Sequence, residues 1–151
     1  MKDTEILTPR LSNLLIEDII VFCKNYNIYL SSEYANFLLK YNESTVNSKR
    51  ILIRRLLESG FIQEFYLGGF LSFKEFQESY LYFYKENTED ELIEASVAII
   101  GQTNGRTSIC IGIGQNNSGQ IFLWDGDFGV TKQADSLQAF FNSLVIDQNQ
   151  S

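Results

Sequence analysis

The glycine-rich stretch at residues 111–127, IGIGQNNSGQIFLWDGD, contains residue types that bind nucleotides and metal ions in many proteins. Gly112 and Gly114 begin like the GxGxxG loop that holds the pyrophosphate of a dinucleotide. Asn117, however, stands where the third glycine of that loop belongs. The residues that follow favour a strand, whereas the loop must lead into a helix. The stretch therefore does not predict a dinucleotide site.

A phosphate-binding P-loop is the second possibility in the same stretch. Gly114 and Gly119 have the spacing of its two glycines. Gln120 and Ile121 then replace the lysine and the hydroxyl residue that contact phosphate and magnesium. We therefore interpret the glycines as turns between adjacent strands and predict no bound cofactor.

Asp125 and Asp127 could bind a divalent cation or act as an acid and a base. The pair begins like the calcium loop of an EF-hand, but Val130 occupies the position of its invariant glycine. Two interpretations remain: two turn-forming acids at the end of a strand, or a weak site for a divalent cation. We favour the first and predict no metal centre.

Histidine is absent from the chain, which removes the commonest general base and the commonest metal ligand. Cys23 and Cys110 have no CxxC spacing and no further cysteine or histidine to complete a structural zinc site. We interpret both as buried free thiols. Catalysis would have to use carboxylates, lysine, tyrosine or cysteine, and we predict that the protein is not an enzyme and has no catalytic residues.

Negative charge is concentrated in the second half of the chain. Residues 1–85 carry ten basic and ten acidic residues, whereas residues 86–151 carry two basic and nine acidic residues, which accounts for the net charge of -7. Such a surface opposes binding to nucleic acid or an anionic membrane and attracts a basic protein. The alternative is that these acids only keep the protein soluble. The acids that we assign to a partner-binding face are Glu86, Glu89, Asp90, Glu91, Glu94, Asp125 and Asp127.

Lys49, Arg50, Arg54 and Arg55 form a small basic cluster that could contact phosphate groups. No glycine-rich loop accompanies the cluster, and no stacking aromatic residues can be placed beside it. We therefore favour a solvated strand face over a nucleic-acid site.

Four amphipathic helices are predicted from apolar residues that recur at spacings of three and four. The first begins at Thr8 and Pro9, a capping hydroxyl followed by proline at the first helical position, and continues through Leu11 to Tyr26. The predicted caps of the other three helices are Ser31 with Ser32, the capping box of Ser72 with Glu75, and Asp135.

Short apolar runs separated by glycine turns follow from residue 96, a pattern that is typical of antiparallel strands. The predicted strands are 97–103, 106–114, 120–127 and 129–134. Between the first two, Asn104-Gly105 predicts a type I′ turn, in which both central residues have positive φ. Residues 50–70 are ambiguous, because their periodicity fits both a helix and a hairpin.

These elements predict a single α+β domain over residues 1–151, with a core at about residues 8–146 and short flexible termini. We expect a central, mostly antiparallel sheet of about five to six strands, with N-terminal helices, a middle helix and a C-terminal helix packed around it. The N-terminus is charged where a signal peptide would be apolar, and no segment is long and apolar enough to span a bilayer. We therefore expect the protein in the cytoplasm.

The order of several short motifs resembles the SUKH superfamily, the Smi-Knr group, from about residue 11 to residue 144. The segment KNYNIYLSSEYANFLLKYN is similar to the Leu-Pro-x-x-Tyr-x-x-Phe-Leu element of these domains, FYLGG to their Phe-Leu-Gly element, and GQIFLWDGD to their Gly-x-Val-Tyr-x-Trp-Asp strand. The matching positions in the first and third elements are Leu30, Tyr34, Phe37, Leu38, Tyr41 and Asn42, and Gly119, Phe122, Trp124 and Asp125. The resemblance implies that residues 50–70 are two strands.

Bacterial members of this superfamily are mostly immunity proteins that bind and neutralise a toxin encoded beside them. The resemblance therefore implies an immunity protein whose acidic face contacts a cognate polymorphic or contact-dependent toxin domain, such as a basic nuclease. The alternative is a scaffold or regulatory module of the cell-wall-regulator type, which binds a cellular protein. In both cases the partner is a protein rather than nucleic acid or membrane, and we expect a monomer or a weak homodimer.

Overall fold

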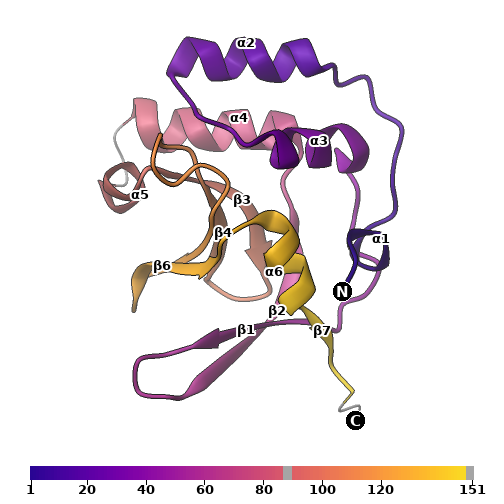
Figure 1. Ribbon diagram of the computed structural model, residues 1–151, viewed down its shortest axis with the longest axis vertical. Coiled ribbons are helices and arrows are strands. Elements are labelled where there is room, and N and C mark those ends of the chain that lie inside the picture. The colour runs from indigo at the N-terminus through magenta and orange to yellow at the C-terminus, as the bar shows by residue number, and fades with distance from the viewer. Residues whose placement is uncertain (87–89, 149–151) are drawn as a thin grey trace.

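The computed structural model describes residues 1–86 and 90–148, and it contains one seven-stranded antiparallel sheet covered by helices (Figure 1). The order of the strands in the sheet is β6-β5-β4-β3-β2-β1-β7. The strands are β1 Ile51–Leu56, β2 Ile62–Phe70, β3 Val97–Thr103, β4 Ser108–Gly112, β5 Ile121–Asp125, β6 Gly129–Ala134 and β7 Val145–Ile146. The predicted α+β class is confirmed, and the sheet has more strands than the five to six that we expected.

Helices precede, interrupt and follow the strands, as the sequence predicts. They are α1 Asp3–Ile6, α2 Ile16–Tyr26, α3 Ser32–Tyr41, α4 Phe73–Tyr80, a π-helical turn η1 Leu81–Lys85, α5 Asp90–Ala95 and α6 Leu137–Ser143. Residues 50–70 form the hairpin of β1 and β2, which resolves the ambiguity in favour of strands. No helix among the described residues has the length and apolar character needed to cross a membrane.

The capping residues fix where three of the helices begin. Ser31 Oγ accepts the N–H of Tyr34 at the start of α3, and Ser72 and Glu75 form a reciprocal capping box at the start of α4. Both predicted starts are confirmed. The prediction of Asp135 as the cap of α6 is wrong by one residue, because Ser136 Oγ accepts the N–H of Ala139 instead.

The segment before α2 is not helical, so the predicted helix start at Thr8 and Pro9 is wrong. Residues 8–15 run across the end of α3 in an extended path, and Leu11 is fully exposed. Tertiary contacts outweigh the local cap here: Thr8 Oγ1 donates to Asn47 Oδ1 at 2.8 Å, and Arg10 N donates to the carbonyl of Lys40 at 3.1 Å. A helix over these residues would lose both contacts.

The connection between β3 and β4 also differs from the prediction. Neither Asn104 nor Gly105 has positive φ, so the turn is not type I′. The hydroxyl of Thr103 donates to the carbonyl of Thr107 at 2.8 Å and accepts the N–H of Gly105 at 3.2 Å. This buried side chain holds a longer loop closed, which is a contact that the dipeptide Asn-Gly does not reveal.

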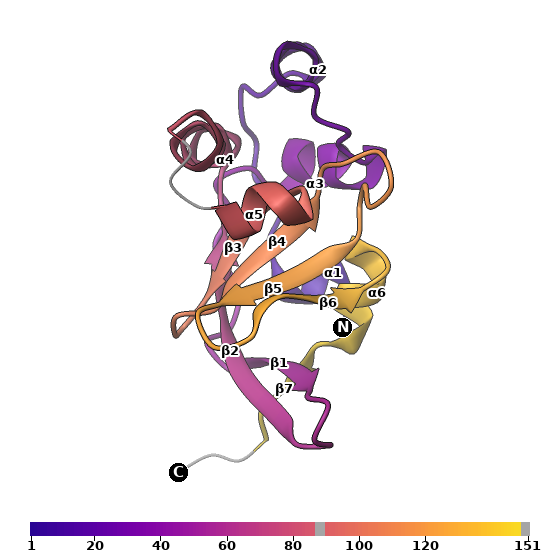
Figure 2. The same ribbon diagram turned by 90° about the vertical axis from the view of Figure 1, so that its left-hand side faces the viewer.

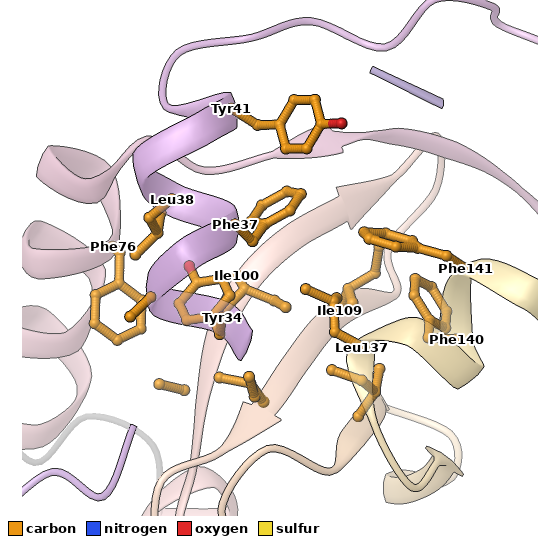
Figure 3. Packing of buried hydrophobic residues seen from close by; sticks show 14 of the residues in the cluster. Tyr34, Phe37, Leu38, Tyr41, Phe76, Ile100, Ile109, Leu137, Phe140 and Phe141 are labelled. Atoms are coloured by element: carbon orange, nitrogen blue, oxygen red, sulfur yellow. The ribbon is translucent and has the colours of Figure 1, made fainter. Parts of the chain in front are cut away.

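Alternation along the central strands places apolar side chains on both faces of the sheet. On one face, Ile100 and Ile109 pack among the aromatic side chains of α3, α4 and α6 (Figure 3). On the other face, Ile99 and Cys110 pack with Leu92 of α5 in a smaller cluster. Figure 2 shows α5 lying across β3 and β4 on this second face. Both faces of β3 and β4 are therefore buried, whereas β5 is buried on one face and half-buried on the other.

The main core also reaches the N-terminus. Ile6 and Leu7 precede residue 8, where we expected the core to begin, and both side chains are fully buried. Leu7 forms an isolated antiparallel bridge with Val46. The first turn of the chain is thus a packed part of the domain.

The sheet curls so that β1 meets strands that are not its neighbours in the strand order. Arg55 Nη2 of β1 contacts Asp125 Oδ2 of β5 at 2.7 Å, although β2, β3 and β4 lie between these two strands. The side chain of Gln133 on β6 donates to the carbonyl of Arg54. These contacts join β1 to β5 and β6 at one end of the curled sheet.

Candidate functional site

Helix α5 and the end of η1 carry most of the acids that we assign to partner binding. Glu86, Glu91 and Glu94 are all exposed. Glu89 lies outside the described residues, and the structure describes the helical backbone of Asp90 but not its side chain. The sequence did not predict a helix here, although Leu92 within the acidic run is the apolar residue that anchors α5 to the sheet.

Contacts with the sheet fix the position of α5. Leu92 is buried in the smaller cluster, and the hydroxyl of Tyr84 donates to the carbonyls of Leu92 and Val97 at 3.0 and 2.7 Å. These bonds satisfy carbonyl groups around the end of the short helix, which could not be stable alone. The acids on the outer side of α5 are therefore presented from a fixed backbone.

Glu91 connects α5 to the hairpin of β5 and β6. The indole Nε1 of Trp124 donates to Glu91 Oε2 at 3.0 Å, and the Trp124 ring packs edge-on against Phe83 with centroids 5.9 Å apart. A side-chain carbon added at Gly129 would lie 3.6 Å from the same carboxylate oxygen. Glu91 thus lies beside both strands of this hairpin. Trp124, which the family motif singles out, is half-buried and also orients this acid.

Asp127 lies in the turn of the same hairpin and is exposed. Its N–H and that of Phe128 donate to Asp125 Oδ1 at 2.9 and 2.8 Å, which fixes the turn. Asp127 therefore lies on the hairpin that Glu91 contacts, although the two acids are 36 positions apart in the sequence. We use the term acidic face for Glu86, Glu91, Glu94 and Asp127.

Asp125 does not belong to this face, although we assigned it to the partner-binding acids from the sequence. Only 9% of its side chain is exposed, and it forms a buried ion pair with Arg55, which is 4% exposed. Arg55 also contacts Gln63 Oε1 and lies over the rings of Phe65 and Phe128 at 5.2 and 5.0 Å. The carboxylate is therefore paired inside the protein and is not exposed beside Asp127.

The pKa of Asp125 reflects this environment. Burial raises the pKa, but the N–H groups of Phe128 and Asp127 and the guanidinium of Arg55 lower it more, and the net pKa lies below the ordinary value for aspartate. Arg55 likewise departs from the solvated strand face that we predicted for the basic cluster, because its side chain is buried.

Two lysines lie on the segments that carry the acidic face. Lys85 is an exposed base that adjoins Glu86 in sequence, and Lys132 on β6 is paired with Asp135 at 2.5 Å. The ring of Phe128, next to Asp127, is 46% exposed. An exposed aromatic side chain beside several acids is a combination that protein interfaces use for anchoring and for orientation.

The thiols are not suited to nucleophilic chemistry. Burial raises the pKa of Cys23 to about 11 and that of Cys110 still higher, which keeps both thiols protonated at neutral pH. Cys110 is fully buried and Cys23 partly so. Among the residues that the structure describes, no three cysteine or carboxylate side chains come together in a way that could hold a metal ion.

A family model described as the SMI1 / KNR4 family (SUKH-1) matches residues 14–143. The matched span begins just before α2 and ends with the last residue of α6, so it includes the acidic face and leaves out α1 and β7. No curated protein matches the chain significantly. The family match confirms the resemblance that the sequence motifs indicated.

Proposed function

Because the chain belongs to the SMI1/KNR4 (SUKH-1) family, we propose that it is an immunity protein that neutralises a cognate bacterial polymorphic or contact-dependent toxin. The family includes immunity proteins for polymorphic toxins. The proposed action is one-to-one binding of a toxin domain, without catalysis.

The observation that carries the proposed binding mode is the acidic face. Its acids are exposed, and Glu91 and Asp127 come from segments that are fixed by hydrogen bonds to Trp124 and Asp125. Fixed charges favour binding, because less side-chain and loop freedom is lost when a partner docks. The complementary partner is a basic protein surface.

A toxin that acts on nucleic acid has such a surface, because its lysine and arginine residues must contact phosphates. An acidic protein that covers those residues competes directly with the nucleic acid. Long-range attraction between the two surfaces also speeds their encounter, and this effect falls as salt screens the charges. We therefore propose a basic nuclease domain as the toxin and the acidic face as the surface that covers its phosphate-binding residues.

The test uses the toxin domain encoded beside this chain. Co-expression should restore growth, and the two proteins should purify as a stable complex. A variant with Glu86→Gln, Glu94→Gln and Asp127→Asn should bind the toxin about tenfold or more weakly, with a smaller dependence on salt. The matched control, Glu43→Gln with Glu58→Gln and Glu78→Gln, removes the same charge from exposed positions elsewhere.

If the two triple variants weakened toxin binding equally, only the net charge of the protein would matter. This result would contradict the assignment of the acidic face as the interface. Failure of the wild-type chain to rescue growth from any adjacent toxin would contradict the immunity function itself.

A further inference from the structure

Helix α2 forms the outermost layer of the molecule, beyond α3 and α4 in both views (Figures 1 and 2). Its inner side packs on the core through Ile19 and Phe22. Its outer side carries Ile20 and Val21, which are 53% and 56% exposed. Solvated helix faces normally carry polar residues at such positions. The outer side of α2 is therefore an apolar surface without a covering element among the described residues.

The outer side has the residue spacing of a helix-pairing seam. Glu17, Ile20, Val21 and Lys24 follow one another at intervals of three, one and three residues, which places all four on one side of the helix. The same spacing on the inner side selects Ile19, Phe22 and Cys23, which pack on the core, and Tyr26, which is 40% exposed and contacts the ring of Phe22. The outer stripe thus has an apolar centre, an acid one turn before it and a base one turn after it.

This arrangement of charge is complementary to a second copy of itself in the antiparallel direction. When two such helices pack antiparallel about a two-fold axis at Ile20 and Val21, Glu17 of each copy lies opposite Lys24 of the other. Symmetric dimers use one surface patch twice, so every favourable contact occurs twice. In a parallel arrangement the acids would face each other, and so would the bases, which is unfavourable.

The apolar surface continues beyond the stripe itself. Ile16 and Ile20 also line a groove of about 520 Å³ between α2 and α3, together with Ile28 and Tyr29. Tyr29 is 52% exposed at the edge of this groove. The second copy therefore has apolar surface to cover on α2 and beside it.

We propose that α2 mediates a weak two-fold homodimer, in which it packs antiparallel against α2 of a second copy. Helix α2 has 11 residues and so spans about 16 Å. One helix pair of this length buries less than the roughly 1,600 Å² of a typical stable interface. The dimer is therefore in equilibrium with the monomer at micromolar to millimolar concentration. This inference goes beyond the proposed immunity function and does not depend on it.

Sedimentation velocity of the full chain over that concentration range tests the dimer. The wild-type protein should shift from monomer toward dimer, and Ile20→Glu should raise the dissociation constant about tenfold or more. Leu56→Glu is the matched control, because Leu56 is also an exposed aliphatic residue but lies on β1. It should leave the association unchanged.

Charge reversal tests the antiparallel arrangement. Glu17→Lys alone and Lys24→Glu alone should each weaken self-association, because each places like charges opposite one another. A mixture of the two variants should form a heterodimer, since every lysine then faces a glutamate. Circular dichroism of each variant checks that α2 is still folded.

Three outcomes would overturn the proposal. They are a wild-type chain that stays monomeric at every concentration, a dimer that responds equally to Leu56→Glu, and a mixture of the charge variants that does not associate. A monomeric chain whose Ile20→Glu variant loses toxin binding would assign this surface to the toxin instead.

Discussion

Arg55 and Asp125 show how a single buried ion pair can close a sheet. Their side chains meet at 2.7 Å from strands that are separated by three others in the sheet. Gln63 and the rings of Phe65 and Phe128 surround the guanidinium. A buried pair of this kind adds little net stability compared with apolar residues, but a single buried charge left without its partner is costly.

We therefore expect Asp125→Ala to lower the free energy of unfolding by about 3 kcal/mol or more, because it leaves Arg55 charged and unpaired inside the protein. Glu64→Ala is the control, since Glu64 pairs with Arg54 at 2.9 Å on the exposed surface, and it should cost less than about 1 kcal/mol. Urea unfolding of both variants gives the comparison. Similar losses in the two variants would contradict the role of burial.

The same pair predicts a dependence of stability on pH. The pKa of Asp125 is lowered in the folded state from an unfolded value of about 3.9, so the unfolded chain binds the proton more readily. The stabilisation is complete above the unfolded pKa and is lost as the pH falls through the folded pKa. As the pH falls from neutral to below about 4, the free energy of unfolding should therefore decrease less in the Asp125→Asn variant than in the wild type. Parallel acid-unfolding curves for the two proteins would rule this out.

At the scale of elements, helix ends show where local signals suffice. Ser31 and the box of Ser72 with Glu75 act within one turn of their own helices, and the sequence predicted both. The start of α6 depends also on a distant residue, because Glu33 accepts the N–H groups of Leu137 and Gln138 at 2.9 and 3.2 Å. Glu33 belongs to the first turn of α3, so the two helix starts are joined.

Ser136→Ala should lower the free energy of unfolding by about 1 kcal/mol, because Ser136 is the residue that caps α6. Asp135→Ala should change it by less than about 0.5 kcal/mol, since the Asp135 side chain is 83% exposed and pairs only with Lys132 in the described contacts. Thermal or urea unfolding would measure both changes. A larger loss of unfolding free energy for Asp135→Ala than for Ser136→Ala would show instead that Asp135 is the cap, as the sequence predicted.

At the scale of the whole molecule, two apolar clusters lie on opposite faces of one sheet. Both draw side chains from β3, β4 and β5, so loss of these strands would disrupt both clusters. Helix α5, with the acids of the proposed interface, is attached only through the smaller cluster and its hydrogen bonds in the described structure. The stability of the candidate site is therefore coupled to that of the whole sheet.

This coupling predicts a single unfolding transition. Trp124 is the only tryptophan and packs against the smaller cluster, so its fluorescence reports on the α5 face. Far-UV circular dichroism reports on all helices and strands. The two signals should give the same midpoint in urea. A fluorescence change at clearly lower urea would show instead that the α5 face unfolds separately.

Much of the candidate site could be predicted from composition and order alone. The excess of acids after residue 85 is visible in the sequence, and Glu86, Glu91, Glu94 and Asp127 are exposed as a binding role requires. The sequence did not show that Asp125 differs from these exposed acids. An aspartate at the end of a strand has the same neighbours in sequence whether its side chain is exposed to solvent or paired with a buried arginine.

The sequence by itself determined the strands from β3 to β6 and the caps of α3 and α4, because these depend on residues within a few positions of one another. It also determined the family to which the chain belongs, because that depends on the order of short motifs along the chain. Only the tertiary structure decided that residues 8–15 are not helical, that Glu91 of α5 binds the indole of Trp124, and that Asp125 is buried against Arg55. Each of these features depends on contacts between residues that are more than 30 positions apart in the sequence. The curl of the sheet brings Arg55 and Asp125 together.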